Sequence, residues 1–213
     1  MKKTLLILVT LLVGQTMSAY DGVAKLFTEE KGEIFNSLSL VARYDLLNNY
    51  GKDTKAEQLN GLQTSESHIL KLTHDYMLIA TSQGGRVEMK LLPKSKKDTV
   101  LAVIETVITP YKDSRISFYD MNWNQLPTDK FITVPTIDDF INEKAPRQLV
   151  EELKSLVYFA MIELTFEDET LIAKCNLEDF FMGENFARYA PIVTDRVVYS
   201  IKKAKFKKEK PKH

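Results

Sequence analysis

Five short segments rich in β-branched and aromatic residues lie between residues 69 and 121 of this 213-residue chain. They are Ile69–Leu72, Tyr76–Thr81, Arg86–Leu92, Thr99–Thr109 and Arg115–Met121. The connections between them have only three to six residues, which is too short for the crossover that parallel strands require. The sequence therefore predicts an antiparallel meander of about five strands.

Two of these segments differ in hydrophobic pattern. Val100–Ile104 is apolar at every position, which is typical of a strand covered on both faces. Arg86–Leu91 instead alternates between polar and apolar residues, which indicates a sheet with one face in water. We therefore expect Thr99–Thr109 to be a central strand of a sheet that has one exposed face.

Helices are predicted on either side of this block. A helix over residues 37–50 is expected to end at Gly51. Its buried face would consist of Leu40, Val41, Tyr44 and Leu47, with Arg43 on the opposite side. A second helix begins at Pro146, with a buried stripe of Leu149, Val150, Leu153 and Leu156. We expect both helices to flank the sheet.

The rest of the chain mixes short strands and helices. Thr136 and Asp139 have the spacing of a capping box, which predicts a short helix to about Asn142. A short strand is expected at 131–134, three further strands at 157–166, 170–176 and 196–201, and a helical segment at 177–189. The fold class is therefore α+β, with a mostly antiparallel sheet, intervening helices and a further three strands.

The two ends of the chain are basic. Lys2 and Lys3 precede an apolar run, Thr4–Gly14, and small residues follow up to Ala19. This is the layout of a signal peptide, residues 1–19, cleaved near Ser18/Ala19, and the run is too short to span a bilayer. The protein is then expected to be periplasmic or secreted, without a transmembrane segment.

The last twelve residues form a second basic segment. Residues 202–213 contain seven lysines against Glu209, whereas the net charge of the whole chain is zero. Residues 20–201, the expected single domain, therefore carry a net charge of −8, which argues against nucleic-acid binding. We expect 202–213 to be a basic tail that is dispensable for folding, with Lys207–His213 disordered or held only loosely.

Several motifs indicate a family. Leu72–Tyr76 and Lys90–Pro93 are two of them, and the others are Asp113-Ser114, Phe118-Tyr119-Asp120 and Trp123. With these motifs the chain resembles a family of exported Bacteroidales proteins, the domain of unknown function number 3256. The resemblance implies export and one shared architecture over the mature chain, and it implies no activity.

Residues with catalytic or metal-binding potential are few. His68 and His74 are about 20 Å apart if one strand joins them, at roughly 3.3 Å per residue, and no metal-ligand spacing completes them. Cys175, the single cysteine, lies in a strand-like segment and is expected to be a small buried hydrophobe. Asp75, Asp98, Asp113 and Asp120 sit near strand ends, where turn and capping roles are expected. No catalytic residue, metal or cofactor is assigned.

One aromatic segment suggests a binding surface. If the strand continues through residue 123, Tyr119, Met121 and Trp123 share one face and Phe118 points the other way. Tyr119 and Trp123 would then form an aromatic platform for a sugar ring or a partner chain. The alternative is that both faces are covered and Trp123 is ordinary packing.

Three functions remain open. The first is a non-enzymatic envelope or secreted protein that binds a macromolecule or small ligand. The second is a carrier of an apolar molecule in a sheet-lined cavity, for which Met77, Met89, Met121 and Met161 are candidate lining residues. The third is a hydrolase of envelope polymers that uses paired carboxylates. The first fits best, because no nucleophile or general base has an identifiable partner.

Overall fold

The computed structural model describes residues 20–52, 67–157 and 161–210, except for the side chains of residues 183 and 184. The predicted signal peptide, residues 1–19, lies outside the described residues, as do residues 53–66. Within the described part of the chain, no helix is long and apolar enough to cross a bilayer.

The first sheet is the predicted antiparallel meander, with its strands in chain order. Its strands are β1 (His68–Leu72), β2 (Tyr76–Ser82), β3 (Gly85–Pro93), β4 (Thr99–Val107), β5 (Asp113–Tyr119) and β6 (Gln125–Leu126). The five predicted strands are confirmed, and the two-residue β6 is an addition. Strand β4 pairs with β3 and β5, and Val100–Ile104 is at most 2% exposed, so the central strand is also confirmed.

A second antiparallel sheet has the order β10-β9-β8-β7. Its strands are β7 (Ile162–Glu167), β8 (Thr170–Cys175), β9 (Arg196–Lys202) and β10 (Lys205–Lys208). It therefore has four strands where three were expected. Strand β10 corrects the predicted boundary at Ile201, because Lys205–Lys208 pairs with Tyr199–Lys202. Its pairing overrides the charge of the lysines because Phe206 packs against the core between the sheets.

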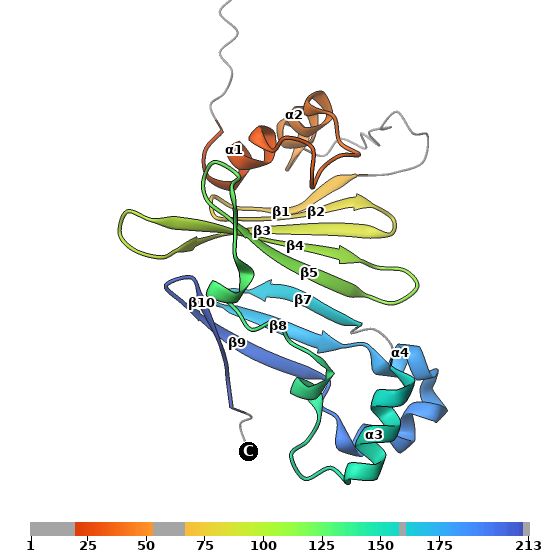
Figure 1. The fold of residues 1–213 in the computed structure, drawn as a ribbon. Coiled ribbons are helices and arrows are strands. Elements are labelled where there is room, and N and C mark those ends of the chain that lie inside the picture. Colours follow the sequence, from red (N-terminus) through yellow and green to blue (C-terminus); the bar gives the residue numbers. More distant parts are fainter. Residues whose placement is uncertain (1–19, 53–66, 158–160, 211–213) are drawn as a thin grey trace, which may run out of the picture.

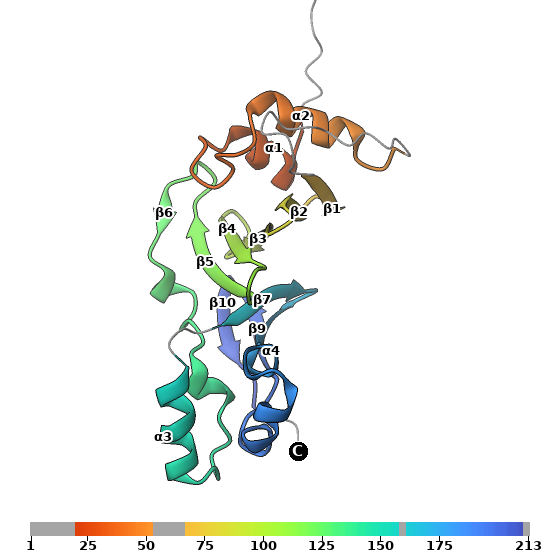
Figure 2. The same cartoon turned by 90° about the vertical axis from the view of Figure 1, so that its right-hand side faces the viewer.

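The elements are stacked in layers (Figure 1). Helices α1 (Gly22–Glu29) and α2 (Leu40–Asn49) cover one face of the first sheet, and the second sheet lies below the other face. Helices α3 (Arg147–Leu156) and α4 (Leu177–Phe181) lie at the far end of the second sheet, as Figure 2 shows from the side. The prediction that both 37–50 and 146–156 flank the first sheet is thus wrong for α3, which packs in a separate small core with Leu177 and Tyr189.

Helix α1 was not predicted, and it closes the upper core. Val23, Leu26 and Phe27 are buried against Met77 and Met89 of the first sheet. The chain enters α1 at Gly22, whose φ of +54° favours glycine. A Cβ at this position would overlap the carbonyl oxygen of His74, which accepts a hydrogen bond from Val23 N. This contact fixes α1 to the β1–β2 turn.

Helix α2 presents a different face to the core than its periodicity indicated. Leu46 and Leu47 are buried, whereas Leu40 and Val41 are 52% and 70% exposed. Arg43, predicted to face water, is 4% exposed. Its guanidinium donates to the carbonyl oxygens of Phe27, Glu30, Leu38 and Phe35. The backbone around the α1–α2 connection therefore sets the rotation of α2, because four carbonyl groups there accept from Arg43.

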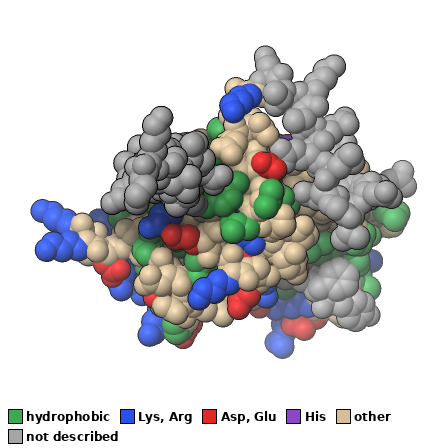
Figure 3. Space-filling model, turned by 90° about the horizontal axis from the view of Figure 1, so that it is seen from above, with side chains coloured by type: hydrophobic (Ala, Val, Ile, Leu, Met, Phe, Trp, Pro, Cys, Tyr) green, Lys and Arg blue, Asp and Glu red, His purple; other side chains and the backbone are tan. Residues whose placement is uncertain are grey.

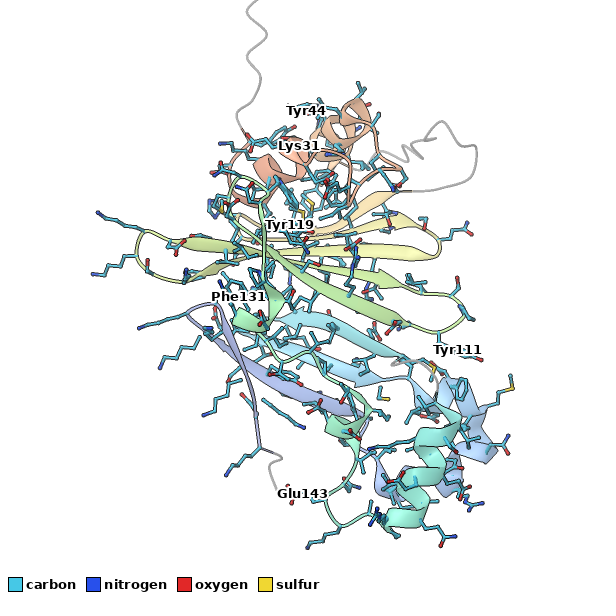
Figure 4. All side chains as sticks on the ribbon, in the orientation of Figure 1. Lys31, Tyr44, Tyr111, Tyr119, Phe131 and Glu143 are labelled. Carbon is cyan, nitrogen blue, oxygen red and sulfur yellow. The ribbon has the colours of Figure 1, made fainter. Side chains whose placement is uncertain are left out.

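The face of β3 that was expected to meet water is covered instead. Glu88 is fully buried, and Leu92 on the same face belongs to the core between the sheets. The second sheet supplies the cover through residues such as Leu164 and Phe166. Figure 4 shows Phe131 in the space between the two sheets and Tyr119 on the helix side of the first sheet.

Short 3₁₀ helices occupy much of the remaining chain. They are η1 (Thr128–Lys130), η2 (Ile137–Phe140), η3 (Gly183–Arg188) and η4 (Ala190–Ile192). The capping box of Thr136 and Asp139 is confirmed at the start of η2. The strand expected at 131–134 does not form; Phe131 and Ile132 instead pack into the core between the sheets, and Phe131 O accepts from Phe206 N of β10.

Candidate functional site

The two sheets meet at the free edge of β7, which side chains of the first sheet cap. Ile162 N donates to Asp113 Oδ1 at 3.1 Å, Leu164 N to Ser114 Oγ at 2.9 Å, and Phe166 N to Glu88 Oε2 at 2.9 Å. Alternate residues of a strand direct their N–H groups to the same edge. Three side chains thus satisfy the edge that would otherwise be open to pairing with another strand.

Four charged groups lie around this junction. Arg86 Nη2 is 2.6 Å from Glu163 Oε1 and 3.8 Å from Glu88 Oε1. Lys112 Nζ is 3.3 Å from Glu163 Oε2. Tyr76 OH donates to Glu88 Oε2 at 3.0 Å. Glu163 therefore has two cations as partners, whereas Glu88 has only Arg86, at the longer distance of 3.8 Å.

Glu88 is incompletely bonded within this cluster. In the described part of the chain, its Oε1 and the Nε of Arg86 are buried without a hydrogen-bond partner. Burial raises the pKa of the Glu88 carboxyl, and the bonds from Phe166 and Tyr76 and the charge of Arg86 offset this only in part. The group can hold a proton, but its burial leaves no access for a substrate.

A cavity of about 450 Å³ lies beyond the end of β8. The apolar part of its wall consists of Leu177, Phe186, Ala190 and Val193. The polar part consists of Asn142, Thr194, Cys175, Glu178 and Asp195. Its frame is hydrogen-bonded: Asn142 N donates to Ile192 O at 2.8 Å, and Cys175 N donates to Asp195 O at 3.1 Å. A volume of this size with mixed lining is typical of a site for a small ligand.

Cys175 is half-buried at the end of β8, where it borders this cavity. Burial raises the pKa of its thiol to about 11, so the thiol stays protonated at neutral pH and is a poor nucleophile. Glu178 and Asp195 give the wall negative charge, and no described ion pair involves either of them. The wall can thus contact apolar groups and accept hydrogen bonds.

The structure places the predicted aromatic pair under the helices. Strand β5 ends at Tyr119, so the expected strand face through Met121 and Trp123 does not exist. Asp120 turns the chain by accepting from the N–H groups of Asn122 and Asn124, and Trp123 has a φ of +64°. The indole of Trp123 lies 5.1 Å from the ring of Tyr119 and donates to Leu26 O of α1. These contacts join the β5–β6 turn to α1, and a ligand role for the pair stays a prediction.

The other residues that could take part in metal binding or catalysis are the histidines and four aspartates. His74 lies 4.0 Å from Asp21 in the exposed turn after β1, whereas His68 begins that strand. Among the described residues no group of three or more His, Cys, Asp or Glu side chains could hold a metal ion. Of the four aspartates, Asp113 and Asp120 accept backbone N–H groups as above, Asp75 accepts from Thr73 Oγ1, and Asp98 pairs with Lys94. Each of the four thus has a turn, capping or ion-pair role in the structure.

The methionines proposed as a cavity lining also lie apart. Met77 and Met89 are in the upper core, Met161 is in the small core beside α3, and Met121 is 41% exposed. The Arg86–Glu88 cluster was not predicted, because the alternating pattern of β3 assigned both residues to a face in water. The cavity was not predicted either, because its walls come from segments about 50 residues apart, such as those of Asn142 and Thr194, and no local pattern marks it.

Comparison with known proteins agrees with the fold. A family model described as "Protein of unknown function (DUF3256)" matches residues 15–206. A solved structure, that of a domain of an uncharacterized protein from Porphyromonas gingivalis W83, has a TM-score of 0.73 at 23% sequence identity. That match covers 89% of this chain and 99% of the other. No curated protein matches this chain.

Proposed function

The chain belongs to the DUF3256 family, and we propose that it is an exported, non-enzymatic protein that binds a small ligand in the cavity beyond β8. The observation that carries this proposal is the 450 Å³ space and its mixed wall. Phe186 and Leu177 offer apolar contact, while Asn142 and Thr194 offer polar groups. Such a combination fixes the orientation of a ligand as well as its position.

The chemistry around the cavity supports binding over catalysis. The one thiol in the wall, Cys175, is held protonated by burial, and a nucleophile needs the opposite shift. The carboxylates that a hydrolase would require are engaged elsewhere: Asp113 caps β7, and Asp120 caps the turn before Trp123. A carrier with a methionine-lined cavity is less well supported, because the four methionines lie in different regions.

Export rests on the N-terminal sequence. The basic start, the apolar run Thr4–Gly14 and the small residues up to Ala19 support secretion with cleavage near Ser18/Ala19. We expect a mature N-terminus at Ala19 or Tyr20. Mass spectrometry of the protein from the native envelope fraction tests this, and full-length chain recovered from the cytoplasm would contradict it.

The ligand site is tested by filling the cavity. Ala190 lines the space and is exposed to solvent, so Ala190→Trp should block the cavity without disturbing a buried core. We expect native mass spectrometry of the protein purified from its own cells to show a retained small molecule, and the variant to lose it. The fold should be unchanged by circular dichroism.

Ala187→Trp is the matched control. Ala187 lies on η3, is exposed, and is not part of the cavity wall. The control should retain the small molecule. Equal retention by both tryptophan variants, or a parent protein that carries nothing and binds no member of a small-molecule library, would contradict the proposal.

A further inference from the structure

We propose that Glu88 is a proton-operated latch between the two sheets, which holds the edge of β7 more tightly when its carboxyl group is protonated. The latch consists of Glu88 on β3, Tyr76 on β2, and Phe166 on β7, whose N–H group Glu88 accepts. It is independent of the cavity proposed above as a ligand site. It concerns how firmly the second sheet, which carries that cavity, is attached.

The cations near Glu88 only partly neutralise the negative charge of its ionised carboxylate. On its own strand, Arg86 is the nearest cation, but Glu163 of β7 holds the same Nη2 atom at the shorter distance. Lys112, between β4 and β5, is directed to Glu163. Lys90 has its ammonium over the rings of Tyr76 and Phe166, and its ion-pair partner is Asp75 at 3.9 Å. The residue paired with Glu88 on β4 is the apolar Ile104.

Protonation of Glu88 removes its poorly balanced negative charge without breaking the hydrogen bond to β7. A neutral carboxyl group still has an acceptor oxygen, so Oε2 can keep the bonds from Phe166 N and Tyr76 OH. The proton on Oε1 gives a donor to an atom that has no well-aligned partner. The Thr165 side chain on β7 favours the charged carboxylate when it donates to it, but its hydroxyl oxygen can instead accept from the protonated group. Arg86 remains paired with Glu163, and half-exposed Lys112 is solvated. The junction then contains no unbalanced buried anion.

The direction of the pH effect follows from burial. Burial raises the pKa of Glu88 in the folded protein above its value in the unfolded chain, about 4.3. The stabilising contribution of the protonated latch is therefore fully present below that pH, and it is lost as the pH rises through the folded pKa. Each unit of upward shift in the pKa corresponds to about a tenfold change in the opening equilibrium.

The test compares the full chain with Glu88→Gln, which mimics the protonated carboxyl. The melting temperatures of the two proteins should nearly coincide near pH 4.5, and the parent should melt progressively below the variant as the pH rises to 8. Hydrogen exchange of the Phe166 amide, corrected for intrinsic rate, should slow several-fold in the parent between pH 8 and pH 5. The same amide in Glu88→Gln should show no such change.

Glu105→Gln is the matched control, because Glu105 lies on the other face of the first sheet and pairs with exposed Arg115. Its difference from the parent should not vary over this pH range. A constant difference between the parent and Glu88→Gln would overturn the proposal. If Glu88→Gln fails to fold, the carboxyl ¹³C resonance of Glu88 in the parent decides: a midpoint well above 4.3 supports the latch, and an ordinary midpoint overturns it.

Discussion

Glu30 and Glu88 are buried carboxylates that each lie near an arginine, and their pKa values shift in opposite directions. Glu30, between α1 and α2, is 3.1 Å from Arg43, and both side chains are nearly inaccessible to solvent. Glu88, between the sheets, is 3.8 Å from Arg86. Burial by itself raises the pKa of a carboxyl group, yet the pKa of Glu30 is lowered and that of Glu88 is raised.

The difference lies in the hydrogen bonds. The Glu30 carboxylate accepts four consecutive backbone N–H groups, those of Gly32, Glu33, Ile34 and Phe35. Together with Arg43 these bonds outweigh the cost of burial. Glu88 accepts one backbone N–H and the Tyr76 hydroxyl, and the Thr165 side chain lies within reach of its carboxyl group. Its Oε1 has no well-aligned partner among the described residues. The donors aimed at a buried carboxylate, weighed against its burial, thus set the direction of its pKa shift.

The largest expected effect comes from breaking the better-bonded pair. Arg43→Met should lower the free energy of unfolding by about 3–5 kcal/mol, because it removes the cation paired with buried Glu30 and a donor to four carbonyl groups. Of these carbonyl oxygens, that of Phe35 keeps a bond from Leu38 N. Arg188→Met is the control, since that arginine is 63% exposed and its pair with Glu152 lies at the surface. Urea denaturation measures both. A loss under 1 kcal/mol for Arg43→Met would refute this assignment.

A smaller loss of stability is expected from truncating the chain before β10 of the second sheet. Deletion of residues 205–213 should cost about 2–3 kcal/mol, because it removes Phe206, whose ring packs against Phe118 and Phe166. Deletion of residues 210–213 alone should change the free energy by less than about 0.5 kcal/mol. Thermal melting distinguishes the two truncations. Equal melting temperatures would restore the original expectation of a dispensable tail from residue 202.

The caps on β7 allow a finer test of the sheet junction. Ser114→Ala should cost about 1–2 kcal/mol, because it leaves Leu164 N without its acceptor and Thr106 without its hydroxyl partner. Exchange of the Leu164 amide should accelerate, while Ser95→Ala in the exposed β3–β4 turn should leave both stability and exchange unchanged. If Leu164 keeps its protection in Ser114→Ala, the serine is not what caps this edge.

Local patterns were sufficient for the first sheet and insufficient for what covers it. The meander was predictable because short turns and β-branched segments determine pairing between neighbours in the chain. The burial of Glu88 was not predictable from local patterns, because it is covered by Phe166, which is 78 residues away in the chain. The path after Tyr119 was missed because Asp120 turns the backbone, and the strand ends before the period-two pattern does.

The same limit applies to the candidate site. Cys175 was correctly placed on a strand, but its position at a cavity depends on Asn142 and Thr194, which reach it from separate segments. The rotation of α2 was missed for a similar reason. Periodicity counts apolar side chains, whereas Arg43 is buried by the carbonyl groups it satisfies, and the sequence does not reveal those acceptors.

The smallest expected effect tests that rotation of α2. Figure 3, which looks down on the α1–α2 end of the molecule, shows hydrophobic side chains at the surface. Val41 is 70% exposed and Leu47 only 7%, although periodicity assigned both to one buried face. Val41→Ser should therefore change the free energy of unfolding by less than about 0.5 kcal/mol, and Leu47→Ala should cost about 2–5 kcal/mol. Urea denaturation of the two variants ranks them directly. If Val41→Ser proves as destabilising as Leu47→Ala, Val41 faces the core. In that rotation of α2, Arg43 could not donate to the carbonyl groups beside Glu30, and the contrast between Glu30 and Glu88 would lose its basis.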